Sequence, residues 1–293
     1  MSKHYLGEDL QSAYRRGHST ETALLKVKDV IMQHVYNQEG VFLVLLDLSA
    51  AFDTVNHDLL LNRMSHEIGL TGIALDWMKS YFTGRTTAVV IDDIYSTAQT
   101  MNYGLPQGSI LGPRAFTIYT IPIGRIIQKH SLSFHMYADD IQIFCSFKPS
   151  DPSSIVSALL SLTNCINEIR TWMTFNFLKL NNEKTEFMVI ASRHNKRWMP
   201  NVSLQIGDEI IRPSTSVRNL GVIFDNEMNM AQQVISLSKN ITYHLRNITR
   251  IRRFLDHETC NHIIRSLVLS RLDYGNALLV GSNTKYITRL QRL

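Results

Sequence analysis

Three aspartates stand where carboxylates could act together. Asp139 and Asp140 are adjacent and lie between two apolar, aromatic-rich runs, residues 134–138 and 141–144. This pattern predicts strand, tight turn and strand, with both acids at the tip of a hairpin. A solvated Asp-Asp turn is the commoner meaning of such a pair, and a metal site would require another carboxylate from elsewhere in the chain.

A third carboxylate follows the most apolar run of the sequence. Residues 41–46 predict a strand buried on both faces, and Asp47 comes directly after it. An acid at that place is costly unless it is paired or binds metal. If this strand neighbours the hairpin, three carboxylates converge, and their oxygen ligands favour Mg²⁺ completed by substrate phosphates. Two ions about 3.5–4 Å apart could activate a 3′-hydroxyl and stabilise a leaving pyrophosphate, which is nucleotidyl transfer.

Four other residues have both a structural and a functional interpretation. Gln107 stands in a loop rich in Gly and Pro, residues 104–113, whose backbone can approach a ligand closely. Taken alone, Phe52 is interpreted as a core residue and Lys184 as a solvated surface residue. Arg15 precedes an expected helix start, where it could bind phosphate or remain solvated.

Hydrophobic periodicity and turn residues predict the elements that position these side chains. Helices are expected after the cap residue Ser19, at 57–68, at 71–82, as one segment through 116–129, from Asp151-Pro152 over five turns, from Met230, and at 258–269. Further strands are expected at 86–91 and 94–100, at 204–211 folded at Gly207-Asp208, and at 220–224.

Three local expectations can be compared directly with a structure. Thr22 is a poor capping-box partner for the cap residue of the first helix, because Glu or Gln is usual there. Trp77 and Phe82 are expected as core anchors of helix 71–82. The second acidic pair, Asp92-Asp93, is interpreted as turn chemistry and not as a site.

Composition bounds the function. With 293 residues, 44% hydrophobic and 19% charged, the chain is a folded protein of one large or two ordinary domains. The net charge of +5 mildly favours a polyanionic partner. The three cysteines, Cys145, Cys165 and Cys260, are too widely spaced to suggest a zinc site or a disulfide framework. The apolar run 41–46 is too short for a membrane span.

Basic residues gather in the last part of the chain. The helix expected from Met230 has an apolar stripe and basic residues at its other positions. These basic residues suit either contacts with a phosphate backbone or an ordinary solvated helix face. Its candidate nucleic-acid contacts are Lys239, Arg246, Arg250 and Arg253. The composition changes near residues 225–230, where we expect a subdomain boundary.

The sequence resembles the reverse transcriptases of non-long-terminal-repeat (LINE-type) retrotransposons. Six motifs occur in the family's order over nearly the whole chain: QSAYRRGHSTETALL, LDLSAAFDTVNH, GLPQGSILGP, YADD, LKLNNEKTEF and LGVIF. The resemblance implies an α+β right-hand polymerase, whose palm holds an antiparallel sheet between partial fingers and a partial helical thumb. Residues 1–228 would form fingers and palm, with incomplete N-terminal fingers, and residues 229–293 the C-terminally shortened thumb.

The resemblance also implies roles for the active-site residues. Asp47, Asp139 and Asp140 would be the catalytic acids and metal ligands, with the first two as the principal ligands of Mg²⁺. Phe52 matches the sugar gate, whose ring excludes a ribose 2′-hydroxyl. Gln107 matches the glutamine beside the incoming nucleotide.

Other residues match positions that bind the substrates elsewhere. Lys184 matches a lysine that serves the leaving pyrophosphate, and Arg15 falls in a finger motif near the triphosphate. Leu220 and Gly221 match the primer grip. The basic thumb residues would contact the nucleic-acid backbone.

Departures from the family pattern leave the catalytic groups intact. Ala13-Tyr14 stands where the family usually has Gly-Phe, Arg114 where an apolar residue is usual, and Ile141 where Thr is common. The first finger motif and an endonuclease domain are missing upstream, and the chain ends inside a helical pattern. We therefore expect the reverse transcriptase core of a longer element, or a decaying genomic copy of one.

The resemblance favours an RNA-directed DNA polymerase. Its partners would be an RNA template, a DNA primer or target, and deoxynucleotides, and its cofactor would be two Mg²⁺ ions, for which Mn²⁺ can substitute. The alternative is an inactive relic that keeps the fold and binds RNA. A viral RNA-dependent RNA polymerase is disfavoured, because Phe52 would exclude ribonucleotides and Tyr-Ala-Asp-Asp replaces Gly-Asp-Asp. A nuclear or cytoplasmic ribonucleoprotein without membrane attachment is expected.

Overall fold

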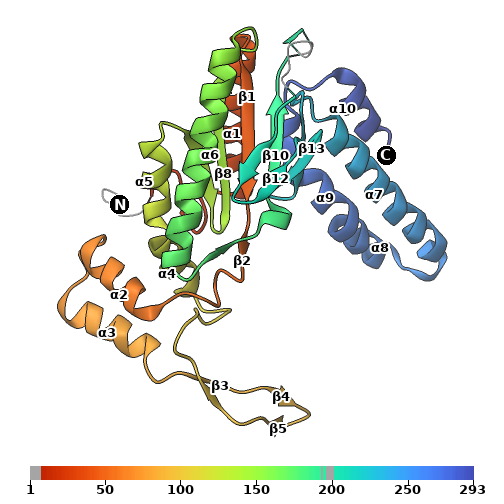
Figure 1. Cartoon of the computed structure of the whole chain (residues 1–293). Helices are drawn as coiled ribbons and strands as arrows, with labels where there is room; N and C mark the ends of the chain where they lie inside the picture. Colours follow the sequence, from red (N-terminus) through yellow and green to blue (C-terminus); the bar gives the residue numbers. More distant parts are fainter. Residues whose placement is uncertain (1–7, 193, 196–200) are drawn as a thin grey trace.

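A four-stranded antiparallel sheet forms the centre of the molecule. The structure is a computed structural model that describes residues 8–192, 194–195 and 201–293. The strand order is β10-β1-β8-β7, and Figure 1 shows this sheet between helices. The strands are β1 (Gly40–Leu46), β7 (Ser133–Tyr137), β8 (Asp140–Phe147) and β10 (Glu186–Ile190).

The two faces of this sheet belong to two hydrophobic clusters. Along β1, Phe42 and Val44 pack into one cluster, whereas Val41 and Leu43 pack into the other. This alternation follows from the two-residue repeat of a strand, and it explains why the run is apolar throughout. Helices α4 (Gly112–Tyr119), α5 (Ile121–Lys129) and α6 (Pro152–Phe175) cover the first face, and α1 (Thr20–Tyr36) covers the second.

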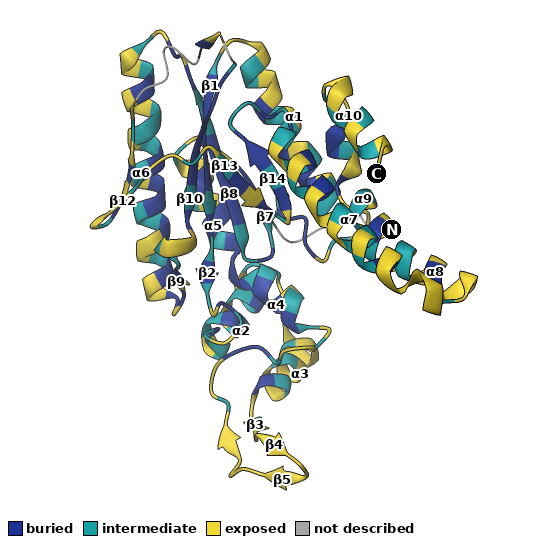
Figure 2. Cartoon of the chain, turned by 90° about the vertical axis from the view of Figure 1, so that its right-hand side faces the viewer, coloured by how far each residue is buried: buried dark blue, intermediate teal, exposed yellow. Residues whose placement is uncertain are grey.

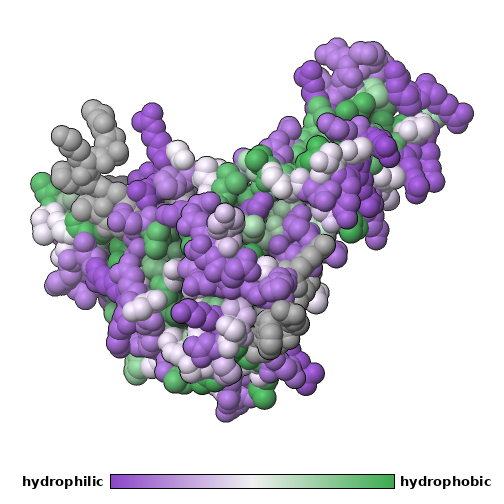
Figure 3. Space-filling view, turned by 90° about the horizontal axis from the view of Figure 1, so that it is seen from above, coloured by the Kyte–Doolittle hydropathy of each residue, from purple (hydrophilic) through white to green (hydrophobic). Residues whose placement is uncertain are grey.

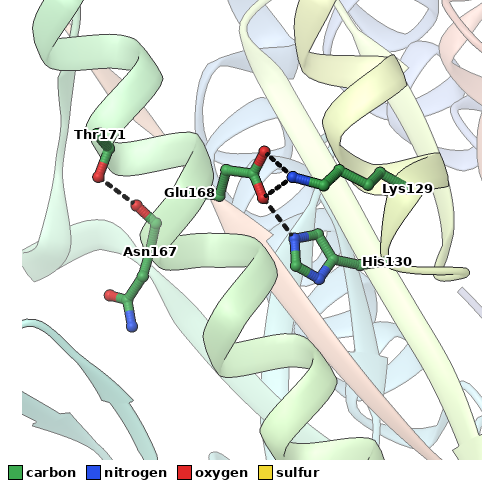
Figure 4. A network of polar contacts seen from close by, with 5 residues as sticks. All are labelled: Lys129, His130, Asn167, Glu168 and Thr171. Atoms are coloured by element: carbon green, nitrogen blue, oxygen red, sulfur yellow. Dashed lines mark hydrogen bonds and ion pairs between the residues drawn. The ribbon is translucent and has the colours of Figure 1, made fainter.

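A network of ion pairs fastens α5 to α6 (Figure 4). Lys129 Nζ lies 2.8 Å and His130 Nε2 lies 2.8 Å from the two carboxylate oxygens of Glu168. The hydrogen bonds from these two side chains lower the pKa of Glu168. The network joins the C-terminal end of α5 to the side of α6 and includes none of the three aspartates, so we interpret it as structural.

Smaller elements surround the sheet. They are β2 (Leu48–Ser49), α2 (His57–His66), α3 (Gly72–Phe82), β3 (Thr86–Thr87), β4 (Val90–Ile91), β5 (Ile94–Tyr95), β6 (Gln99–Thr100), β9 (Lys179–Leu180), η1 (Asn182–Lys184), β11 (Leu204–Ile206), β12 (Glu209–Ile211), β13 (Ser216–Asn219) and β14 (Val222–Asp225). Strands β3 to β6 form a long hairpin that projects from the body and is exposed along its length (Figure 2).

The C-terminal part is helical, as expected, and comprises α7 (Ala231–Ile251), η3 (Arg252–Phe254), α8 (His257–Ile264), η4 (Arg265–Leu269), α9 (Ser270–Asp273), η5 (Asn276–Leu279) and α10 (Thr284–Gln291). It has its own small apolar cluster, which includes Ile241, Cys260 and Val268. Its exposed face in Figure 3 is mostly hydrophilic, with separate apolar residues. The division at residues 228 and 229 stays a prediction.

Most expected elements are present, and four details were wrong. Thr22 does complete a capping box with Ser19. Trp77 is 54% exposed, because α3 lies at the edge of the body and buries Phe82 instead. The segment 116–129 is two helices that meet at Thr120, with a proline in the first turn of the second. Residues 220 and 221 form the turn between β13 and β14 and are not part of a strand.

Candidate active site

The sheet register places Asp47 next to the turn that carries Asp139 and Asp140. Strands β1 and β8 are antiparallel, and Leu46 pairs with Ile141. The next step of this register places Asp47 opposite Asp140, because the partners of an antiparallel ladder advance in opposite directions. Asp139 occupies the turn just before β8. The expected convergence of one strand end with one hairpin tip therefore follows from the topology.

An open cleft of about 350 Å³ lies over this end of the sheet. Its walls come from β1, β8, the 3₁₀ turn η1 and strand β13, which lie far apart in the sequence. The residues that matter for its chemistry are Asp47, Asp140, Gln142, Lys184, Arg218 and Leu220.

The electrostatics of the cleft show that the acids interact. The pKa of Asp140 is raised to about 6, first by burial and then by the charges of Asp139 and Asp47, whereas Lys184 lowers it. Burial also raises the pKa of Asp139, with a contribution from Asp47. Proximity to other carboxylates disfavours ionisation, and a nearby cation would relieve that penalty.

The donor set fits a hard divalent ion that completes its shell with substrate oxygens. All three groups are carboxylates, the ligand type that Mg²⁺ prefers, and their mutual repulsion would be relieved by a cation. Within residues 8–192, 194–195 and 201–293, however, no three side chains of His, Cys, Asp or Glu are grouped closely enough to hold a metal. The expected three-carboxylate metal site is therefore not preformed. Mg²⁺ usually keeps several water ligands and also binds substrate phosphates, so it does not require a site made only of protein side chains.

Lys184 lies beside the acids. Its Nζ is 3.4 Å from Asp47 Oδ2, and Asn181 Nδ2 is 3.3 Å from the same oxygen. The Asn181 backbone N–H also donates to the Asp47 carbonyl at 2.9 Å. Pairing of Leu48 with Leu180 in the β2-β9 ladder produces this proximity. Asn181 was missed as a site residue, although it stands in the LKLNNEKTEF motif.

Phe52 and Gln107 belong to two loops that pack on each other. The Phe52 ring stacks on Phe116, with centroids 4.7 Å apart, and the Phe52 carbonyl accepts a hydrogen bond from Leu105 N–H at 2.7 Å. Gln107 Nε2 donates to Asp53 Oδ1 at 3.1 Å. Phe52 is thus partly a core residue, as first interpreted, but its place in a loop beside Gln107 leaves the gate role open.

Gly104 explains why this loop needs glycine. Its φ is +89°, and a Cβ there would lie 2.9 Å from the Asp53 carbonyl oxygen. A side chain at this position would therefore separate the two loops that carry Phe52 and Gln107.

The turn of Leu220 and Gly221 borders the cleft through Leu220. Both residues have positive φ, 43° and 84°. The Tyr274 hydroxyl donates to the Leu220 carbonyl at 2.7 Å, so a residue of the helical C-terminal part fixes the turn. Below the turn, buried Asn219 donates through Nδ2 to Gln142 Oε1 at 2.9 Å, which connects β13 to β8, the strand that begins with Asp140.

Of the expected binding residues, Lys184 and Leu220 line this cleft, whereas Phe52, Gln107 and those named next do not. Arg15 donates from its guanidinium to the Asp9 carbonyl at 3.0 Å. Lys239, Arg246 and Arg250 are exposed on α7. Arg253 lies over the Phe254 ring at 4.6 Å from its centroid. Lys239, Arg246, Arg250 and Arg253 belong to the helical C-terminal part and do not line the cleft over the acids.

Tyr14 is a further residue near the acids that sequence reasoning did not assign. Burial raises the pKa of its phenol, and the charge of Asp139 raises it as well. Its φ of 58° is unusual for an aromatic residue, and its side chain is 50% exposed. The sequence sign for Tyr14 was that it replaces the Phe that the family usually has at this position.

Comparisons with known proteins agree with this geometry. The sequence model of one family, described as reverse transcriptase (RNA-dependent DNA polymerase), matches residues 1–224. The chain is 26% identical over 267 residues to a probable RNA-directed DNA polymerase from transposon BS of Drosophila melanogaster, covering 85% of this chain and 26% of the relative. It is 25% identical to the RNA-directed DNA polymerase from mobile element jockey of the same species, covering 78% of this chain and 24% of the relative.

A solved structure supports the fold. The apo telomerase from Candida tropicalis superposes with a TM-score of 0.50 at 11% identity, covering 96% of this chain and 50% of that structure. The chain spans about a quarter of the length of the two Drosophila relatives. In the part of the chain described by the structure, no helix combines the length and apolarity needed to cross a membrane.

Proposed function

The chain belongs to the reverse transcriptase (RNA-dependent DNA polymerase) family, and from that membership we propose that it is the polymerase core of a LINE-type retrotransposon protein. The proposed reaction adds deoxynucleotides to a primer 3′-hydroxyl opposite an RNA template. The observation that carries it is the register of β1 and β8, which sets Asp47 opposite the Asp139-Asp140 turn in an open cleft beside Lys184.

The three acids would hold the divalent ions. Asp47 and Asp139 would be the principal ligands and Asp140 an accessory one, as the resemblance to the family implies. Two bound Mg²⁺ ions, or Mn²⁺ in their place, would supply activation of the 3′-hydroxyl and stabilisation of the pyrophosphate. The protein's own contribution would be to hold the carboxylate oxygens of the three aspartates at one end of the central sheet.

Lys184 would serve the leaving group. In the free protein its ammonium lies beside Asp47 at 3.4 Å and is mostly exposed to solvent. An incoming triphosphate would compete with Asp47 for this ammonium, because it carries several negative charges whereas Asp47 carries one. Placed there, its proton could neutralise the pyrophosphate oxygen as the bond to the α-phosphorus breaks.

Phe52 and Gln107 would recognise the nucleotide. Stacking on Phe116 fixes the Phe52 ring, so a ribose 2′-hydroxyl would meet a side chain that cannot move aside easily. Gln107, oriented by Asp53, would lie beside the base or sugar. Arg15 would approach the triphosphate from the N-terminal segment.

The nucleic acids would lie between the two parts of the chain. The Leu220-Gly221 turn would grip the primer end, and the basic residues of α7 and η3 would contact the phosphate backbone. In this proposal residues 1–228 act as fingers and palm and residues 229–293 as the thumb.

Primer extension tests the proposal. Purified protein, a DNA primer on an RNA template, deoxynucleotides and Mg²⁺ should give template-directed products that disappear with EDTA and with Asp47→Asn. Products that Asp47→Asn leaves unchanged would contradict the assignment of the site. Absence of products from the wild type, with RNA binding retained, is the result expected of an inactive relic.

A further inference from the structure

The turn that carries Asp139 has an unfavourable backbone. Ala138, the residue directly before it, has a φ of 56°. L-residues with a Cβ avoid this left-handed region, and alanine has no polar side chain to stabilise it locally. Some other group must hold Ala138 in place, because its conformation sets the direction in which Asp139 leaves the strand.

That group is the side chain of Gln11. Its Oε1 accepts hydrogen bonds from Ala138 N–H at 3.0 Å and from Ala13 N–H at 2.9 Å. Its Nε2 donates to the Ala138 carbonyl at 3.3 Å. One amide thus contacts the N–H and the C=O of the same residue, which lie on the two sides of its Cα. These contacts fix both backbone torsions of Ala138.

Gln11 is itself held firmly. It is 1% exposed and forms a parallel bridge with Met136 of β7. Next to it, Met136 N–H donates to the Leu10 carbonyl at 2.9 Å and Ser12 N–H donates to the Met136 carbonyl at 3.0 Å. The N-terminal segment is therefore attached to the free edge of β7, and its glutamine reaches the tip of the hairpin.

We propose that Gln11 is the positioning residue of the catalytic turn. Through its hydrogen bonds to Ala138, it couples the position of Asp139 to that of the N-terminal segment. In this way it fixes the position of the Asp139 carboxylate relative to Asp47. The inference rests on the proposed polymerase function and deepens it. Gln11 touches neither substrate nor ion, and it acts through the backbone of Ala138.

Glutamine suits this role for chemical reasons. Its amide ends in an oxygen that can accept two hydrogen bonds and an NH₂ group that can donate, on a side chain of the required length. Methionine has nearly the same length and can replace neither hydrogen bond, so Gln11→Met leaves the peptide groups of Ala138 unpaired in a buried place.

Ser12 provides a matched control. It is buried to a similar degree, 3% exposed, and its Oγ lies 2.8 Å from His135 Nε2 on the same strand β7. Ser12→Ala therefore breaks a buried contact between the same two segments but leaves Ala138 untouched. A purely structural role for Gln11 predicts that the two variants behave alike.

The experiment measures Mn²⁺ affinity by electron paramagnetic resonance, together with kcat and the KM for deoxynucleotide. Gln11→Met should weaken Mn²⁺ binding about 10-fold and lower kcat by about 10- to 100-fold, because residues behind metal ligands have effects of that size. The KM should change by less than about threefold, as expected for loss of positioning rather than binding. Ser12→Ala should change all three by less than about threefold, although both variants lower the melting temperature.

A second variant separates the role of the turn from general damage. Glycine adopts positive φ without a Cβ clash, so Ala138→Gly makes the turn conformation accessible without the hydrogen bonds from Gln11. In the Ala138→Gly background, Gln11→Met should therefore lose less kcat and Mn²⁺ affinity than in the wild type.

The outcomes are distinguishable. Equal effects of Gln11→Met and Ser12→Ala, or an unchanged Mn²⁺ affinity in Gln11→Met, would overturn the inference. A wild-type protein that binds Mn²⁺ but extends no primer would contradict the proposed function while the Mn²⁺ comparison still tests Gln11. A wild type that does not bind Mn²⁺ would contradict both.

Discussion

The chain contains two hairpins whose turns carry an Asp-Asp pair, and the two have different surroundings. Asp92 and Asp93 join β4 to β5 at the tip of the projecting hairpin, where every residue is exposed. Asp139 and Asp140 join β7 to β8 at the end of the central sheet. In the first pair, both aspartates themselves adopt the positive φ values that the turn requires, 46° and 65°. In the second, the preceding alanine takes the positive φ.

This difference shows what turns a dipeptide into a site. The exposed pair can be solvated fully, so its charges cost little. The other pair is partly buried beside a third carboxylate, and burial raises the pKa of Asp140 to about 6. Such an arrangement is unfavourable for the free protein and favourable for a protein that binds a cation, so it is a hypothesis of function. The predictions below test this contrast.

The largest expected effect comes from removing one charge at each turn. Asp139→Asn should lower the rate of primer extension at least about a thousandfold, since losses of that order follow removal of a central catalytic group. Asp93→Asn should leave the rate within about twofold, because it changes only a solvated turn. Single-turnover extension on an RNA template measures both. Similar losses in the two variants would mean that charge in general, and not this site, supports the reaction.

The cation beside the buried pair gives the next effect. Lys184→Ala should lower the rate of extension by about 100-fold, the size expected for loss of general acid catalysis. Lys179→Ala, on the neighbouring strand β9, is the control and should have little effect. The difference should appear in kcat more than in KM. A change confined to KM would assign Lys184 to binding alone.

The proposed gate residue, Phe52, gives the third effect. Phe52→Ala should lower discrimination against ribonucleotides by about 10- to 100-fold, because steric rejection of one added hydroxyl is of that order. Competition between deoxynucleotide and ribonucleotide in one reaction measures this ratio. Unchanged discrimination would discard the gate assignment and leave Phe52 as a core residue packed on Phe116.

The buried pair should also lower stability in the absence of metal. The pKa of Asp140 is raised from 3.8 to about 6, so between these values the native state binds more protons than the unfolded state. Stability then falls as the pH rises through this range, and it stays lowered above it. Asp140→Asn removes the penalty and should stabilise the protein at pH 7.5 on the order of 1 kcal/mol, a figure reduced for partial exposure of the side chain.

Denaturant unfolding at two pH values measures that effect. The gain from Asp140→Asn should be present at pH 7.5 and absent near pH 4, where the wild-type carboxyl is protonated in the native state. The control Asp93→Asn should show no such pH dependence. A destabilised Asp140→Asn at pH 7.5 would contradict the view that the charge is unfavourable in the free protein.

The smallest effect concerns the exposed turn. Asp93 has a φ of 65° in a two-residue turn, where glycine is favoured. Asp93→Gly should stabilise the hairpin by about 0.5 kcal/mol and leave primer extension unchanged. Hydrogen exchange of the Ser96 amide, which donates to Val89 in the hairpin, should slow by about twofold. Faster exchange would contradict this interpretation of the turn.

Sequence reasoning found the acids because their signals are local. A run of six apolar residues ending in Asp47, and a hairpin pattern around Asp139, can be read within short windows. Gln11 could not be found in this way. It lies 127 residues from Ala138, and nothing around it indicates that its amide closes a turn of another segment.

The wrong expectations have physical causes of the same kind. The aromatic residue Trp77 fits a helical apolar face, but α3 packs at the edge of the body, where little core is available to cover it. Residues 220–224 look like one apolar strand, whereas the positive φ of Leu220 and Gly221 makes a turn that Tyr274 fixes from far along the chain.

Binding of Mn²⁺ tests the central contrast most directly, because it depends on the site and not on turnover. Two double variants are compared with the wild type by electron paramagnetic resonance, in the presence of primer, RNA template and deoxynucleotide. Asp139→Asn/Asp140→Asn should lose the bound Mn²⁺ seen in the wild type, whereas Asp92→Asn/Asp93→Asn should retain it. Equal binding by both variants would contradict the assignment of the buried Asp-Asp turn as the metal centre.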